Sequence, residues 1–313
     1  MNGLEIARAY YGTYGRPMLE SEFPQLLDRI AVGLTGSGSE CFGFDDEVSR
    51  DHDFEPGFCI FLPDEDTVDR RTAFLLERAY AKLPREYMGL RRGLMQPVGG
   101  ARRGVMRTGE YFTAKVGSAD GILTVGQWLS VPESALAEAV NGELFFDGAG
   151  EVTAIRERLS VCPEDIRRKK LAGCLLMMAQ AGQYNYGRCL AHGETGAAQL
   201  AAGEFAAHGM HAVFLLNRRY MPFYKWRFRA MRRLPLLALH AELAEYLLTT
   251  DNSQETAREK QDVMEGMAAD IIDELRRQGL TQAVCGDLEK HAYAVNDAVE
   301  DAGIRNMHIL AAV

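Results

Sequence analysis

The segment VGLTGSGSECFGFDDEVSRDHDF, residues 32–54, gathers residues whose types and spacing could perform chemistry. A glycine-serine turn, Gly36-Ser37-Gly38-Ser39, follows a short apolar run, and Asp51-His52-Asp53 comes shortly afterwards. Glycine permits backbone conformations with φ > 0, so the N–H groups of such a turn can converge on a phosphate. We therefore treat the turn as a candidate anion-binding site.

Asp51 and Asp53 are two residues apart, so on a β-strand their carboxylates point to the same face while His52 points away. Paired carboxylates suit Mg²⁺. Two such ions could bridge the phosphates of a nucleotide and stabilise the attacking and leaving oxygens of an in-line phosphoryl or nucleotidyl transfer. Taken singly, the turn could be only a turn and the acids only a solvated loop. Their combination favours a nucleotide site.

Other nucleotide motifs fit the segment less well. It lacks the Gly-Lys-Ser/Thr ending of a Walker loop, and no Rossmann-type helix with a suitably placed acid follows it. Those two nucleotide-binding folds are therefore disfavoured.

The elements that must position these residues have a mixed α/β pattern. Short apolar runs that end at Gly or Pro predict strands in AVGLTG, DFEPGFCIFLP, GVMRTGEYFTAKVG and GELFFDG. Helical periodicity predicts helices over 66–83 and 132–140, with two more at 3–11 and 21–30. We assign residues 1–150 to an α/β domain.

The second half has a different pattern, with long helical stretches and few β-branched residues. Helices are predicted over 163–182, 195–218, 220–233, 235–249, 253–278 and 284–301. We therefore expect residues 151–313 to form an all-α helical domain.

The composition of the chain argues against several classes of protein. The formal net charge of −9 argues against a general nucleic-acid binder, which needs a basic surface. The longest apolar stretches are too short to cross a membrane. The six cysteines form no CxxC pair, so we expect reduced thiols in a soluble cytoplasmic protein and no zinc site.

The glycine-serine turn and the Asp51-His52-Asp53 triplet resemble the nucleotidyltransferase superfamily, whose palm is similar to that of polymerase β. In that family Gly and Gly/Ser precede an Asp-apolar-Asp/Glu strand by about a dozen residues. This chain departs from the pattern at His52, which is not aliphatic. The intervening stretch also carries Gly43, so the usual helix there should be short or irregular.

More narrowly, the chain resembles a bacterial group known as domain-of-unknown-function family 4037. The resemblance rests on GSGSECFGFDDEVSRDHDF, NGELFFDGAGEVTAIRERL, PEDIRRKKLA, GQYNYGR, LLNRRYMPFYKW and IRNMHIL, and so covers nearly the whole chain. It implies a nucleotidyltransferase palm followed by a helical domain, and it implies almost nothing about the substrate.

The resemblance also implies a third carboxylate, as a metal ligand or as the general base for an attacking hydroxyl. Glu110 begins the alternating run EYFTAKV, and we slightly favour it. Asp147 ends ELFFD at a strand exit. Either residue could instead be an ordinary surface acid.

The helical half offers candidate binding residues. Tyr184, Asn185 and Arg188 lie close together in sequence, and the first and last are spaced for one helix face. Tyr224 and Lys225 follow Pro222 within the basic aromatic run NRRYMPFYKWRFRAMRR. We expect most arginines of this run to cover a solvated face or the interface of a homodimer. A single-stranded nucleic acid is disfavoured by the net charge.

The sequence thus predicts a Mg²⁺-dependent enzyme that moves a nucleoside monophosphate from a nucleoside triphosphate (NTP) to an acceptor hydroxyl on a small molecule or protein. In this hypothesis residues 36–39 hold the phosphates, and Asp51, Asp53 and Glu110 hold two Mg²⁺ ions. Arg188 and Lys225 neutralise phosphate charge, while Tyr184, Asn185 and Tyr224 line the substrate pocket. The alternative is a nucleotide sensor or partner-binding module that has lost catalysis.

Overall fold

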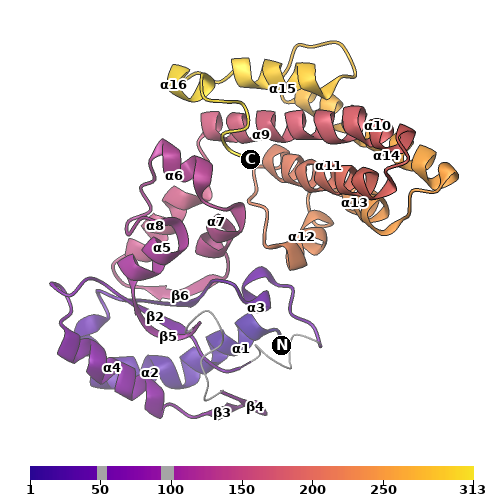
Figure 1. Ribbon diagram of the computed structural model, residues 1–313. Helices are drawn as coiled ribbons and strands as arrows, with labels where there is room; N and C mark the ends of the chain where they lie inside the picture. The colour runs from indigo at the N-terminus through magenta and orange to yellow at the C-terminus, as the bar shows by residue number, and fades with distance from the viewer. Residues whose placement is uncertain (48–54, 93–101) are drawn as a thin grey trace. The chain divides into compact units, whose positions relative to one another are not determined.

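The computed structural model describes residues 1–47, 55–92 and 102–313 of the chain and divides into two compact units. Unit 1 comprises Met1–Gln127 and Val131–Val161, and unit 2 comprises Trp128–Ser130 and Cys162–Val313. Unit 1 contains a mixed β-sheet with helices, whereas unit 2 is helical (Figure 1). The prediction of an α/β domain followed by an all-α domain is confirmed.

The sheet of unit 1 has the strand order β5-β2-β1-β6. Strand β1 (Ala31–Leu34) is antiparallel to both β2 (Cys59–Leu62) and β6 (Glu143–Asp147), and β2 is parallel to β5 (Gly104–Arg107). All residues of β1 and β2 are buried, as their continuous apolar sequences AVGL and CIFL require of central strands.

The strand directions give the sheet two functionally distinct edges. Leu34, at the end of β1, pairs with Glu143, and Gly33 pairs with Cys59 at the start of β2. Cys59 in turn pairs with Gly104 at the start of β5. The residues that follow β1, including the glycine-serine turn, therefore lie at the edge where β2, β5 and β6 begin. We call this edge the turn edge.

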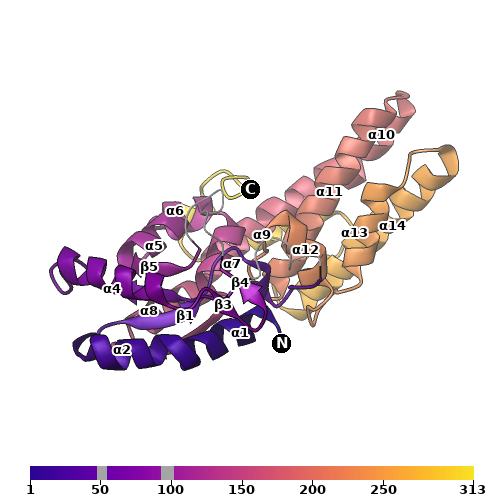
Figure 2. The same cartoon turned by 90° about the horizontal axis from the view of Figure 1, so that it is seen from below.

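Helices lie around the sheet in unit 1 (Figure 2). An aromatic-rich core of Tyr10, Phe58, Ile60 and Leu76 packs on one side of β2, and Phe61 meets Tyr111 edge to face at 5.2 Å on the other. The elements are α1 (Gly3–Tyr10), the π-helix η1 (Tyr11–Gly15), α2 (Arg16–Glu22), η2 (Pro24–Leu26), α3 (Ser39–Phe42), α4 (Arg70–Lys82), the hairpin β3 (Glu86–Tyr87) and β4 (Leu90–Arg91), α5 (Thr108–Val116), α6 (Val125–Ser130), α7 (Glu133–Val140) and α8 (Glu151–Ser160).

Two local predictions in unit 1 are wrong. The strand expected over 104–117 ends at Arg107, and α5 follows, because its buried residues Thr108, Phe112 and Val116 have helical spacing. The helix expected over 21–30 is also absent from this described stretch. Helix α2 ends at Glu22, since a proline at position 24 disfavours helical geometry at the residue before it.

The boundary between the units lies near Val161 instead of residue 150, because α8 belongs to unit 1. Val152, Ile155 and Leu159 of α8 are buried. Arg156 also donates to the carbonyl oxygens of residues 140 and 141, at 2.7 and 2.6 Å, at the end of α7. Burial and hydrogen bonding thus attach this helix to the α/β unit.

Unit 2 is built around α9 (Glu164–Met178) and α11 (Thr195–Leu216), which lie side by side and are both largely buried (Figure 1). The other elements are the π-helix η4 (Ala179–Tyr186), α10 (Gly187–Ala191), α12 (Tyr224–Met231), α13 (His240–Thr249), α14 (Gln254–Arg277), α15 (Leu288–Asp297) and α16 (Ala302–Arg305). None of the helices in the described ranges is both long and apolar enough to cross a membrane.

A buried lysine attaches the C-terminal segment to unit 2. The Lys169 ammonium donates to Asn296 Oδ1 at 2.8 Å and to the carbonyl oxygens of Arg305 and Met307 at 3.2 and 2.7 Å. Burial lowers the pKa of this ammonium. Because three oxygens satisfy its three donors, the charge is tolerated in the interior and fixes the chain end against α9.

Candidate functional site

The glycine-serine turn begins at a residue that only glycine suits. Gly36 has φ of +116°, and its N–H donates to Asn141 Oδ1 at 2.9 Å. Asn141 Nδ2 donates back to the Gly36 carbonyl at 2.7 Å, and the Thr35 hydroxyl lies 3.1 Å from Asn141 Oδ1. Since its N–H is occupied, Gly36 positions the turn and does not offer this group to a ligand.

Two of the next three residues leave their N–H groups open. No acceptor in the described ranges takes a hydrogen bond from the N–H of Ser37 or Ser39, whereas the N–H of Gly38 faces the Cys41 thiol. A Cβ at Gly38 would approach the Glu40 carboxylate to 2.4 Å, so this position also needs glycine. The turn thus presents two closely spaced backbone donors, at Ser37 and Ser39, and an anion nest is built from such donors.

Asp51, His52 and Asp53 lie outside the described residues, so their expected role as metal ligands stays a prediction. Strand β2, which follows them in sequence, begins at Cys59 on the turn edge. In sequence, Asp51 and Asp53 therefore shortly precede the point at which the chain enters the sheet, and that point lies at the turn edge.

The two candidates for the third carboxylate do not lie at the turn edge. Glu110 is exposed in the first turn of α5, just after the far end of β5, where Thr108 donates to the Leu62 carbonyl at 3.0 Å. Asp147 pairs with Ala31 at the far end of β1. Its carboxylate accepts from the N–H and hydroxyl of Thr153, both at 2.7 Å, and so holds the first turn of α8.

A buried charge cluster occupies the turn edge instead. Arg103 Nη2 lies 3.0 Å from Glu40 Oε1, and its Nη1 lies 3.1 Å from Glu55 Oε1. The Arg103 and Glu40 side chains are only 8% and 3% exposed, whereas that of Glu55 is 30% exposed. We call these three residues the Arg103 cluster. It joins the helix after the turn to the segment that leads into β2.

The cysteines at this edge are not suited to nucleophilic chemistry. Burial raises the pKa of the Cys59 thiol to about 12, and its Sγ donates to the Arg102 carbonyl at 3.2 Å. Burial likewise raises the pKa of Cys41 well above its usual value. Both thiols therefore stay protonated near neutral pH, and the chemistry of this edge must come from its carboxylates and backbone donors.

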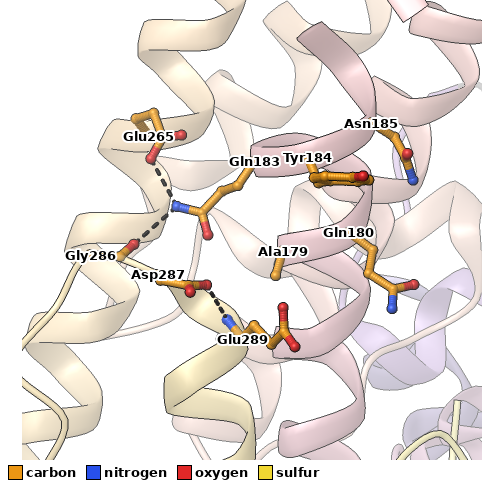
Figure 3. Close-up of a pocket in the computed structure, with 9 residues that line it drawn as sticks. All are labelled: Ala179, Gln180, Gln183, Tyr184, Asn185, Glu265, Gly286, Asp287 and Glu289. Carbon is orange, nitrogen blue, oxygen red and sulfur yellow. Dashed lines mark hydrogen bonds between the residues drawn. The ribbon is translucent and has the colours of Figure 1, made fainter. Parts of the chain in front are cut away.

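A pocket of about 800 Å³ lies in unit 2, where η4 meets α14 and the start of α15 (Figure 3). Tyr184 and Asn185, two predicted pocket residues, both line it. The Arg188 guanidinium lies over the Tyr184 ring, 5.0 Å from its centroid. The complete lining is Ala179, Gln180, Gln183, Tyr184, Asn185, Glu265, Gly286, Asp287 and Glu289.

Tyr224 and Lys225 begin α12 and are not among these lining residues. The Tyr224 ring packs on Phe223 with centroids 4.4 Å apart, and Lys225 Nζ lies 4.9 Å from the centroid of Trp226. Of the three predicted pocket residues, Tyr184 and Asn185 therefore line this pocket and Tyr224 does not.

Several arginines of the basic aromatic run form ion pairs within unit 2. Arg218 contacts Glu164 at 2.8 Å, and Arg232 contacts Glu242 and Glu245 at 2.9 and 2.5 Å. These pairs support a structural role for these two arginines. In the described part of the chain, no carboxylate pairs with Lys225 or Arg188.

A fully buried cysteine, which the sequence analysis did not single out, lies beside a histidine in unit 2. Cys174 Sγ on α9 is 3.4 Å from His211 Nδ1 on α11. Burial raises the pKa of this thiol, but His211 and His208 outweigh burial and bring it down to about 6. No group of three His, Cys, Asp or Glu side chains in the described ranges is arranged to hold a metal ion.

Comparison with known proteins gives a family match for part of the chain. Residues 128–227 match the family described as Domain of unknown function (DUF4037), which confirms the resemblance over that segment. The match covers the end of unit 1 from α7 onward and the first helices of unit 2. No curated protein matches the chain.

A solved structure of a nucleotidyltransferase-like protein from Exiguobacterium sibiricum 255-15 is also similar to this chain. The comparison covers 94% of this chain and 81% of that one, with 11% sequence identity and a TM-score of 0.38.

Proposed function

We propose that the protein is a Mg²⁺-dependent nucleotidyltransferase that moves a nucleoside monophosphate from an NTP to an acceptor hydroxyl. The observation that carries the proposal is the turn after β1. Asn141 holds its first residue, and the N–H groups of Ser37 and Ser39 have no acceptor among the residues that the structure describes. Strand β2 starts at the same edge, directly after the segment that contains Asp51 and Asp53.

In the proposed reaction, the backbone donors and the carboxylates have separate roles that are typical of metal-assisted phosphoryl transfer. The N–H groups of Ser37 and Ser39 would hold the β- and γ-phosphates. Asp51 and Asp53 would hold Mg²⁺, which neutralises charge on the phosphate oxygens. The acceptor oxygen forms a bond to the α-phosphorus while the bond from that phosphorus to the bridging oxygen breaks, and pyrophosphate leaves.

The acceptor proton needs a carboxylate at the turn edge, and neither Glu110 nor Asp147 lies there. At this edge Glu143 is already paired with Arg8. Glu55 is more accessible than Glu40 and lies two residues after Asp53. We therefore place the third carboxylate at Glu55. Arg188 and Lys225 belong to unit 2, and their expected role as phosphate contacts stays a prediction.

The test is to incubate the purified protein with each labelled NTP, with and without Mg²⁺, in the presence of a cell metabolite extract. We expect Mg²⁺-dependent release of pyrophosphate from at least one NTP and transfer of the label to an extract component or to protein. Absence of release from all nucleotides, in an extract that supports a known nucleotidyltransferase, would contradict the proposal.

A second candidate function is a nucleotide-sensing or partner-binding module, and one observation favours it. Glu110 and Asp147, the two acids expected to complete a catalytic set, both lie away from the turn edge. A binding protein needs the phosphate-binding turn but no general base. Saturable NTP binding without pyrophosphate release would support this candidate against the enzyme.

A further inference from the structure

The pocket in unit 2 is formed by an unusual helical segment. Residues 179–186 form the π-helix η4, which interrupts the path from α9 to α10. π-Helices are rare and frequently occur at functional sites. Gln180, Gln183, Tyr184 and Asn185 all come from this segment, so the wide turn itself supplies one wall of the pocket (Figure 3).

The pocket is held in shape by one glutamine. Gln183 Nε2 donates to Glu265 Oε2 at 2.9 Å and to the Gly286 carbonyl at 3.0 Å. Its Oε1 accepts from the Leu288 N–H at 2.9 Å. These bonds join η4 to α14 and to the start of α15 (Figure 3). Because this wall is already fixed, the protein loses little conformational entropy there when a ligand binds.

The lining is acidic and polar. It contains the carboxylates of Glu265, Asp287 and Glu289 and no lysine or arginine. Glu289 points from α15 toward η4, and its carboxylate has no partner in the described ranges (Figure 3). Asp287 Oδ1 accepts from the Glu289 N–H at 2.9 Å as the cap of α15, which leaves its second oxygen for a ligand.

The carboxylates are too dispersed to serve one metal ion. No group of three His, Cys, Asp or Glu residues in the described structure, these three included, is arranged for a metal. Separated negative charges in one pocket instead complement separated positive charges on one molecule. The amides of Gln180 and Asn185 add donors and acceptors for the uncharged parts of such a molecule.

We propose that this pocket binds a small aliphatic molecule that carries two or more ammonium groups. Its ammonium groups pair with Glu289, Asp287 and Glu265, and its chain lies along η4 beside Tyr184. The proposal goes beyond nucleotide transfer and does not depend on it, because all lining residues belong to unit 2.

Calorimetric titration of the full chain with spermidine at 0.15 M salt tests the proposal. We expect saturable 1:1 binding that triacetylated spermidine does not show, because acetylation removes the positive charges. Glu289→Gln should weaken binding by about fivefold, and the double variant with Asp287→Asn by more than about tenfold. Asparagine at position 287 keeps the helix cap, so the double variant should stay folded.

Asp297→Asn is the matched control, because Asp297 is exposed at the other end of α15 and lies outside the pocket. Its affinity for spermidine should equal that of the unmodified chain. Absence of saturable binding would overturn the proposal. So would an equal loss of affinity in Asp297→Asn and Glu289→Gln, which would show attraction to the overall negative charge only.

Discussion

Replacement of Asp53 by alanine is expected to reduce Mg²⁺-dependent pyrophosphate release by roughly a thousandfold or more. The side chain is proposed to hold the metal, which contributes several kcal/mol to stabilising the charge of the transition state, and each 1.4 kcal/mol is a factor of ten in rate. The rate is measured with the NTP that the unmodified protein uses.

The control for this variant is Glu47→Ala, which removes an exposed acid from the same part of the chain. Its turnover should match that of the unmodified protein, and both variants should keep the same melting temperature. A folded Asp53→Ala protein with unchanged turnover would show that Asp53 is not a metal ligand of the reaction.

Replacement of Arg103 by methionine should have the largest effect on stability, a loss of about 3–5 kcal/mol in the free energy of unfolding of unit 1. The variant would leave the carboxylate of Glu40, which is 3% exposed, without its buried guanidinium partner. Arg103 also fills space beside Gly57, where an added Cβ would approach its Cδ to 2.7 Å. The free energy of unfolding is measured by urea titration, and hydrogen exchange of the β1 and β2 amides serves to monitor the unfolding of unit 1.

Arg70→Met provides the matched control. Arg70 also pairs with a glutamate, Glu65, at 2.8 Å, but its side chain is 84% exposed. Exposed pairs contribute about 0–1 kcal/mol, so this variant should unfold nearly like the unmodified protein. Adding Glu40→Gln to Arg103→Met should recover part of the loss, because the buried side chain at position 40 is then uncharged. Equal stability of the Arg103 and Arg70 variants would contradict the assigned role of the cluster.

The class of the fold could be predicted because it depends on local pattern. Buried runs such as CIFL and long helical stretches reveal strands and helices without knowledge of their partners. The sequence EYFTAKV shows the limit of this argument. Its local alternation suggests a strand, but burial at positions 108, 112 and 116 makes it a helix. Glu110 therefore lies on a helix and not on a strand beside the other carboxylates.

The arrangement of the site was harder to predict because it depends on contacts between distant residues. Asn141 holds Gly36 across 105 positions of sequence, and Arg103 contacts Glu40 across 63. Neither spacing leaves a signal in one sequence. Tyr184 and Asn185 could be chosen for their residue types, but the acids opposite them come from α14 and the start of α15.

The most direct test of the account is a crystal structure with Mg²⁺ and an NTP analogue whose bond between the α- and β-phosphates cannot be cleaved. We expect phosphate oxygens within hydrogen-bonding distance of the N–H groups of Ser37 and Ser39, and Mg²⁺ bound by Asp51 and Asp53. A nucleotide bound elsewhere, with no phosphate at the turn, would contradict it.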